Sequence, residues 1–231
     1  MSKCVCIIPA RSGSKRIKNK NIILIKNKPL IYYTIKFAKE LKFVDEIIFS
    51  SDSKKYLKIA KKFGITNLHL RPKYLSNDSA KTVDVIKYDL KKLENDKNFI
   101  VDKVLLLQPT TPFREIKKFN LAYKILKKSV KYDSVITVNM VKNFHPYRMK
   151  VFNGNLIRNF INLKNESFEA VKNLKKIYIR SGSMYFFKKK NLAKYNSILG
   201  NRAYGIEVKD KYTINIDEKD DLIVAKHYLK K

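Results

Sequence analysis

The chain has 231 residues, enough for one α/β domain with a sizeable core, and no apolar run long enough to span a bilayer. It carries 51 lysine and arginine residues against 20 aspartate and glutamate residues, a formal net charge of +31. Only eight of these cations are arginine, and lysine is spread along almost every helix-like segment. This distribution favours solvated lysine faces over one nucleic-acid-binding surface, so neither a specific nucleic-acid partner nor a membrane partner is expected. The N-terminus lacks the regions of a signal peptide, which predicts a cytoplasmic location.

The first predicted element is a short apolar strand, residues 5–8, which ends at Pro9 because proline cannot donate to a ladder. The two cysteines of the chain, Cys4 and Cys6, are two residues apart. They therefore share one face of that strand and are poorly placed to form a disulfide with each other. We expect them to be core residues rather than a metal or redox pair.

A basic loop with small residues follows the strand. Gly13 permits backbone conformations that other residues resist, and the small Ser12 and Ser14 let backbone N–H groups approach an anion closely. Arginine and lysine side chains add charge and donors, and they are Arg11, Lys15, Arg16, Lys18 and Lys20. The loop contains neither GxxxxGK[ST] nor GxGxxG, and a lone turn of this kind would also fit an ordinary surface loop. Its place after the first strand predicts a phosphate-binding loop in an α/β domain.

Strand and helix patterns then alternate up to about residue 140. Helices are predicted at residues 29–41, 53–63, 79–97 and 115–128, and strands at residues 45–51, 65–70, 101–107 and 134–138. This alternation predicts a Rossmann-like, three-layer α/β domain with a mostly parallel sheet. Because right-handed crossovers put all loops that follow parallel strands at one edge, Arg11, Asp52, Arg71 and Gln108 are expected to meet at one crevice.

The pattern changes at residues 142–176, which contain Pro146, Gly154, several asparagines and short apolar pairs. Strand-like composition returns at residues 177–187 and 204–208, and a last helix is predicted at residues 220–229. We therefore expect a single domain, residues 1–231, with an insertion at residues 142–176. His145 lies in this insertion, where a lone histidine is more often structural than catalytic.

Five motifs in order resemble one known family. IIPARSGSKR followed by KNKNI, residues 7–22, resembles IIPARGGSKGIPGKNI, the opening of the acylneuraminate cytidylyltransferases, which are CMP-sialic acid synthetases. The other four motifs are SDS at 51–53, LRPKYLSNDSAKTVDVI at 70–86, LLLQPTTPFR at 105–114 and INIDEKDDL at 214–222. They resemble STDS, RP…L..D.A…DV, LLQPTSPLR and IDIDTEEDL, and five matches in order cover nearly the whole chain.

The resemblance implies a Mg²⁺-dependent cytidylyltransferase that moves CMP from CTP to the 2-hydroxyl of a nonulosonic acid and releases pyrophosphate. Fixed cations must then neutralise the triphosphate and the developing charge, and the expected catalytic residues are Arg11, Lys20 and Asp217. The expected nucleotide-binding residues are Ala10, Arg11, Ser12, Gly13, Ser14, Lys15, Lys20, Asn21, Arg71, Asp78 and Ser79. The insertion corresponds to the family's dimerisation segment, and its large apolar residues predict a homodimer; they are Phe144, Tyr147, Met149, Val151, Phe152, Phe160 and Phe168.

The same resemblance places the sugar acid and the metal. Gln108, Arg180 and Ser181 are expected to contact the sugar acid, although Arg180 fits a sheet-edge ion pair equally well. Asp217 is the expected Mg²⁺ ligand, with Asn215 beside it. Asn215 replaces the first acid of IDID, which puts a two-carboxylate site in doubt, and Ser181-Gly182-Ser183 replaces the usual NGA-type turn. The sugar can therefore be a legionaminate- or pseudaminate-like acid rather than N-acetylneuraminate.

Two alternatives remain open at this point. The first is another sugar-acid cytidylyltransferase, such as one for 3-deoxy-manno-octulosonate, although that family's opening lacks the SGSK spacing. The second is a non-enzymatic, basic nucleotide- or RNA-binding protein on the same fold.

Overall fold

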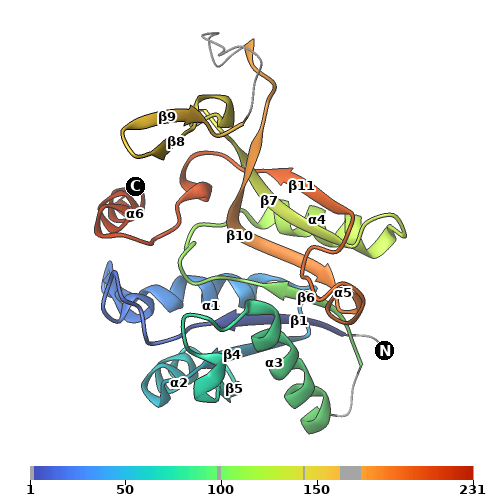
Figure 1. Cartoon of the computed structure of the whole chain (residues 1–231). Coiled ribbons are helices and arrows are strands. Elements are labelled where there is room, and N and C mark those ends of the chain that lie inside the picture. The colour runs from blue at the N-terminus through green and yellow to red at the C-terminus, as the bar shows by residue number, and fades with distance from the viewer. Residues whose placement is uncertain (1–2, 98–99, 143, 162–172, 231) are drawn as a thin grey trace.

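A computed structural model describes residues 3–97, 100–142, 144–161 and 173–230 of the chain. Its centre is a seven-stranded sheet (Figure 1). The strands in spatial order are β11 (Ala203–Glu207), β7 (Ser134–Met140), β10 (Tyr178–Lys188), β6 (Val101–Leu106), β1 (Lys3–Pro9), β4 (Glu46–Ser51) and β5 (Asn67–Leu70). Every pair in this sheet is parallel except the two pairs made by β10. The prediction of a mostly parallel α/β sheet is confirmed.

Helices cover both faces of the sheet, and β1 shows why. Its residues alternate, so that Cys4, Cys6 and Ile8 face one layer while Val5 and Ile7 face the other. The first layer contains α1 (Leu30–Glu40), α2 (Lys54–Lys62) and α4 (Ile116–Lys128), and the second contains α3 (Thr82–Lys97) and the short α5 (Lys190–Lys194). Both cysteines are buried and free, as predicted.

A third apolar cluster fixes the C-terminal part of the chain next to the start of α1. The last helix, α6 (Lys219–Lys230), contributes Leu222 and Ala225, which pack with Ile25, Leu30 and Ile216. Ile25 belongs to the small hairpin of β2 (Leu24–Ile25) and β3 (Lys28–Pro29). This packing brings residues 215–217 back to the edge of the sheet where the basic loop emerges.

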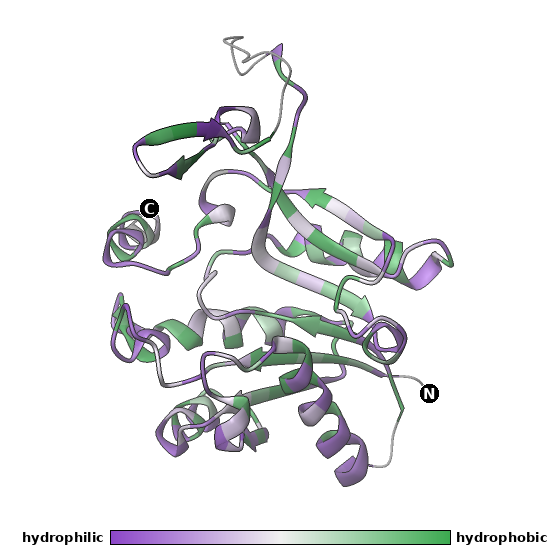
Figure 2. Cartoon of the chain, viewed as in Figure 1, coloured by the Kyte–Doolittle hydropathy of each residue, from purple (hydrophilic) through white to green (hydrophobic). Residues whose placement is uncertain are grey.

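One part of the molecule extends away from the sheet. The hairpin of β8 (Lys150–Asn153) and β9 (Leu156–Asn159) and the first half of β10 stand apart from the central layers (Figure 1). Apolar segments are visible on these strands (Figure 2), and Phe144, Phe152 and Phe160 are mostly exposed. Phe168 of the predicted dimerisation segment lies outside the described residues.

The described residues also form four short helical turns: η1 (Lys20–Ile22), η2 (Lys73–Leu75), η3 (Pro146–Arg148) and η5 (Asp210–Thr213). The main correction to the predicted elements is the start of α3, which was expected at residue 79 and begins at Thr82. The preceding Asn77, Asp78 and Ser79 form turns, in which short polar side chains bond locally instead of continuing a helix. None of the described helices is both long and apolar enough to cross a membrane.

Candidate active site

A cavity of about 640 Å³ opens at the sheet edge where β1, β5 and β6 end. The loops after these strands supply Arg11, Arg71 and Gln108 to its wall, and residues 215–217 close another side. The predicted crevice at the carboxyl ends of the parallel strands is therefore present with Arg11, Arg71 and Gln108, whereas Asp52, which was expected in it, does not line it. Ten of the predicted site residues line it: Arg11, Ser14, Lys15, Lys20, Asn21, Arg71, Asp78, Gln108, Asn215 and Asp217.

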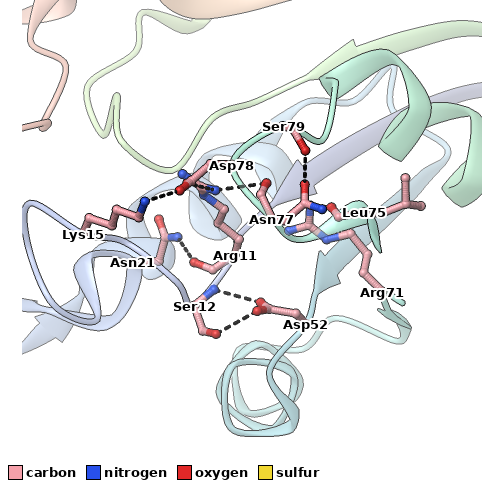
Figure 3. A network of polar contacts seen from close by, with 10 residues as sticks. All are labelled: Arg11, Ser12, Lys15, Asn21, Asp52, Arg71, Leu75, Asn77, Asp78 and Ser79. Atoms are coloured by element: carbon pink, nitrogen blue, oxygen red, sulfur yellow. Dashed lines mark hydrogen bonds and ion pairs between the residues drawn. The ribbon is translucent and has the colours of Figure 1, made fainter. Parts of the chain in front are cut away.

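Asp52 holds the basic loop in place from outside the cavity wall. Its carboxylate accepts hydrogen bonds from both the backbone N–H and the hydroxyl of Ser12, each at 2.8 Å (Figure 3). Asn21 fixes the other side of the loop, because its Nδ2 donates to the Arg11 carbonyl at 2.9 Å. The buried Oδ1 of Asn21 has no partner among the described residues.

Asp78 lies across the cavity mouth from the loop and pairs with two of its cations. Its carboxylate oxygens lie 2.7 Å from Arg11 Nη1 and 2.6 Å from Lys15 Nζ (Figure 3). Hydrogen bonds from Lys15 and Arg11 hold the pKa of Asp78 below its ordinary value. Two of the three cations predicted to bind phosphate, Arg11 and Lys15, are thus paired with an exposed acid in this structure.

Lys20 pairs with an acid from the opposite end of the chain. Its Nζ donates to Asp217 Oδ1 at 2.8 Å, and Arg16 lies 3.8 Å from the same oxygen. The amide of Asn215 donates to the other Asp217 oxygen. Asp221, in the first turn of α6, accepts the backbone N–H of Asp217 at 2.8 Å, which fixes the backbone that carries this carboxylate.

Arg71 is the most deeply buried cation of the cavity wall. Only 7% of it is exposed, and Nη2 donates to the Ser50 carbonyl at 3.3 Å while Nη1 donates to the Leu75 carbonyl at 3.5 Å. Burial lowers its pKa, and the nearby charges of Asp89 and Asp52 partly oppose that effect. Its buried Nε has no partner among the described residues.

The wall formed by Gln108 is supported by a second buried arginine. Arg114 donates from Nη2 to the Gln108 carbonyl at 2.7 Å and from Nε to the Ser183 carbonyl at 3.0 Å, so it ties the end of β6 to β10. Burial lowers its pKa to about 9. Gly182, at φ +78°, lies where an added Cβ would come within 3.4 Å of Gln108 Oε1, so a side chain there would crowd the glutamine.

The geometry of the cavity agrees with the protein family that the sequence matches. A cytidylyltransferase family model matches residues 5–225. The chain belongs to the cytidylyltransferase family. The residues that the family model matches therefore include the basic loop, Arg71, the Gln108 loop and Asp217, which all contribute to the cavity wall.

Members of this family with curated names are similar over most of the chain. A CMP-N,N′-diacetyllegionaminic acid synthase of Legionella pneumophila is 32% identical over 225 residues, which cover 95% of this chain and 90% of that protein. A Helicobacter pylori protein named as a pseudaminic acid cytidylyltransferase and a hydrolase is 32% identical over 89% of this chain, but only 38% of that protein is matched. An N-acylneuraminate cytidylyltransferase of Escherichia coli is 38% identical over 59% of this chain and 31% of that protein. The chain thus spans about a third of the length of these last two relatives.

Solved structures show the same cytidylyltransferase fold. A CMP:2-keto-3-deoxy-manno-octonic acid synthetase in complex with CTP superimposes with a TM-score of 0.71, 16% sequence identity and coverage of 99% of both chains. A 4-diphosphocytidyl-2C-methyl-D-erythritol synthase from Anaerococcus prevotii gives a TM-score of 0.66 at 18% identity.

Six of the residues predicted for the site do not line the cavity: Ala10, Ser12, Gly13, Ser79, Arg180 and Ser181. The backbone N–H of Ala10 donates to the Ser50 carbonyl, and the hydroxyl of Ser79 donates to Asn77, so both lie in the supporting structure. Ser181 is buried, with its hydroxyl 2.7 Å from that of Thr137, and Arg180 is exposed on β10. His145 is buried and contacts the backbone of Lys175 and Tyr147, in keeping with the expected structural role.

Several residues of the site were not predicted. Arg16, which was expected as a cation of the basic loop but not as a site residue, lines the cavity. Arg114 supports the wall from behind, which no local pattern indicates, because its partners lie on β10. His69 and Asp89 lie buried near Arg71. Asp89 could have been found as the one acid on the apolar face of α3, beside Val85, Ile86 and Leu90.

Proposed function

We propose that this chain transfers the cytidylyl group of CTP to the hydroxyl of a nonulosonic sugar acid and releases pyrophosphate. The observation that carries this proposal is the composition of one cavity. A basic loop, a buried arginine and an amide-bearing loop face the same space of about 640 Å³. The family, and the legionaminate, pseudaminate and N-acylneuraminate names of the relatives, support the same reaction.

The cavity can be divided by chemistry. Arg11 and Lys15 supply positive charge for the β- and γ-phosphates once Asp78 is displaced. Lys20, held by Asp217, is aimed at charge that develops on the α-phosphoryl group during transfer. Arg71 and the adjacent Leu75, Ala80 and Val85 form a partly apolar wall suited to a nucleobase with hydrogen-bonding edges. The sugar acid then occupies the Gln108 side.

Mg²⁺ is the proposed cofactor, and the donor set fits it. Mg²⁺ usually takes one or two protein carboxylates and completes its shell with phosphate oxygens and water. Asp217 provides one carboxylate at the cavity wall, and Asn215 provides an amide beside it. Among the described residues no group of three or more histidine, cysteine, aspartate or glutamate side chains could hold a metal alone, so phosphate oxygens and water would have to supply the remaining ligands. When bound, the ion would neutralise triphosphate charge.

A homodimer is the proposed assembly. A mostly apolar groove of about 820 Å³ lies among Met140, Phe144, Met149, Ile177 and Ile179, beside the projecting hairpin. Large exposed apolar side chains on such a surface need a cover. Replacing Phe152 with aspartate should therefore yield monomers by light scattering at micromolar concentration, whereas Val130→Asp, at another exposed position, should leave the dimer intact. A monomeric unmodified protein would contradict the proposal.

The test of the proposed function is a turnover assay that detects pyrophosphate. CTP, UTP, ATP and GTP are each offered with a panel of N-acetylneuraminic, legionaminic, pseudaminic and 3-deoxy-manno-octulosonic acids and Mg²⁺. We expect turnover with CTP and at least one nine-carbon acid. Comparable turnover with UTP would contradict the assignment of base recognition, and turnover with 3-deoxy-manno-octulosonate alone would move the chain to another sugar acid.

A further inference from the structure

Three buried polar side chains lie directly behind Arg71 and outside the cavity wall. Ser50 on β4 and His69 on β5 are register partners on neighbouring parallel strands. Asp89 on α3 packs onto them, and its Oδ1 lies 3.0 Å from both Ser50 Oγ and His69 Nδ1. Ser50 and Asp89 have no exposed surface and His69 has 3%, so this cluster is fully inside the protein.

A carboxylate buried in this way requires an explanation, because burying an uncompensated charge is costly. Since carboxylate oxygens accept only, Ser50 and His69 both donate to Asp89, which leaves its Oδ2 without a partner among the described residues. Arg71 has the complementary deficit, a buried Nε–H without an acceptor. Burial lowers the pKa of Arg71, and among the nearby acids the charge of Asp89 opposes this effect most strongly.

Ser50 links the same cluster to Arg71 through its backbone. The Ser50 carbonyl accepts from Arg71 Nη2 at 3.3 Å, and it also accepts the backbone N–H of Ala10 at 2.8 Å. The hydroxyl of Ser50 meanwhile donates to Asp89. A single residue therefore joins Asp89, Arg71 and the start of the basic loop.

We propose that Asp89, oriented by Ser50 and His69, is a positioning residue that holds the Arg71 guanidinium directed toward the nucleoside side of the cavity. Arg71 touches the ligand, and Asp89 acts through it. This inference rests on the proposed function, because it concerns binding of CTP. It separates two tasks within the cavity: Asp89 acts on the nucleoside end, while Arg11 and Lys15 act on the phosphate end.

The experiment measures dissociation constants of CTP and of inorganic pyrophosphate by calorimetry. Asp89→Asn keeps the shape and one acceptor oxygen but removes the charge, and we expect the Kd of CTP to rise about tenfold while that of pyrophosphate changes less than about twofold. Asp96→Asn, the same change at an exposed position of α3, should alter neither. In an Arg71→Met background, Asp89→Asn should no longer change the Kd of CTP, because its effect passes through Arg71.

His69 provides a second test that does not depend on the Asp89 variant folding. His69→Asn retains a side-chain N–H donor near the position of Nδ1, so CTP binding should stay close to wild type. His69→Leu removes the donor, and we expect the Kd of CTP to rise about threefold. Melting curves by circular dichroism accompany each variant.

The outcomes distinguish the two proposals. If the unmodified protein does not bind CTP, the proposed function fails and this inference fails with it. If it binds CTP but folded Asp89→Asn or His69→Leu protein binds CTP equally well, only this inference is overturned. An equal loss of pyrophosphate binding, or loss of folding in both variants, would likewise overturn it by showing that the cluster serves the fold alone.

Discussion

Two acid–cation clusters line the cavity, and they differ mainly in the burial of one lysine. In the first, Asp78 is shared by Arg11 and Lys15, and the side chain of Lys15 is 81% exposed. In the second, Asp217 is shared by Lys20 and Arg16, and the side chain of Lys20 is only 10% exposed. Each cluster pairs one carboxylate with two cations of the same basic loop. Similar chemistry is thus placed in two different solvent environments.

The difference predicts two different roles. Ion pairs in water contribute little, so phosphate oxygens can replace Asp78 at small cost. The second cluster is fixed by Asn215, by the contact of Asp221 with the Asp217 backbone, and by the low exposure of the Lys20 side chain. A cation held in a fixed position contributes most to stabilising a transition state, because no reorganisation is needed as charge develops. The exposed cluster should therefore govern ligand entry and the buried one the chemical step.

The largest expected effect comes from removing the charge of the buried cluster. Asp217→Asn should lower turnover by about a thousandfold at fixed Mg²⁺, because it removes the only carboxylate proposed to bind the ion and leaves Lys20 without its partner. The measurement is a Mg²⁺ titration at saturating CTP, with circular dichroism to verify the fold.

Asn215→Asp is the matched control at the neighbouring position. It adds an acid beside Asp217, so we expect it to be active and to need less Mg²⁺ for half-maximal rate. Near-normal turnover of the Asp217→Asn protein would show that the metal is held elsewhere and that the two clusters do not differ in role.

A smaller effect is expected for Lys20→Ala. Since its charge is proposed to act mainly in the transition state, kcat should fall about a hundredfold while the KM for CTP changes less than about threefold. Lys18→Ala, an exposed lysine of the same loop, is the control and should retain wild-type rates. The measurement is the steady-state kinetics of both variants. An unchanged kcat for Lys20→Ala would mean that Lys20 has a purely structural role.

The smallest effect, and one of opposite sign, is expected for the exposed cluster. Asp78→Asn frees Arg11 and Lys15, so the Kd of CTP should fall about threefold at low salt. Because Lys15 and Arg11 lower the pKa of Asp78 in the folded chain, the cluster persists at neutral pH and is lost only as the pH falls through that lowered value. Weaker CTP binding by this variant would instead mean that Asp78 contacts the nucleotide directly.

The fold could largely be predicted from sequence because its strands and helices have clear periods. The apolar run of β1 and the spacing of Leu30, Ile31, Ile35 and Ala38 in α1 each specify one element. The hairpin of β8 and β9 was not predicted, because both strands are largely exposed and so lack an alternating apolar pattern.

The sequence predicted cavity-lining residues on loops that follow strands, but not the residues that support the cavity wall from behind. Of the ten predicted residues that line the cavity, those on the loops after β1, β5 and β6 are brought together by the parallel topology, whereas Asn215 and Asp217 are brought there by the packing of α6. Arg114, His69 and Asp89 act through tertiary contacts between elements distant in sequence, for which no local spacing exists. Ser181 was predicted from a turn motif, but the motif does not specify that its hydroxyl is directed toward Thr137.

The two thiols of β1 make the folded state measurable without any ligand. Burial raises the pKa of Cys4 to about 12 and also raises that of Cys6, so both remain protonated and unreactive at neutral pH. An alkylating reagent can reach Cys6 only when the helix layer that covers this face of the sheet moves away from it, which requires the core to open. The alkylation rate therefore reports global opening of the chain, and any compound that binds only the folded form slows it in proportion to its occupancy.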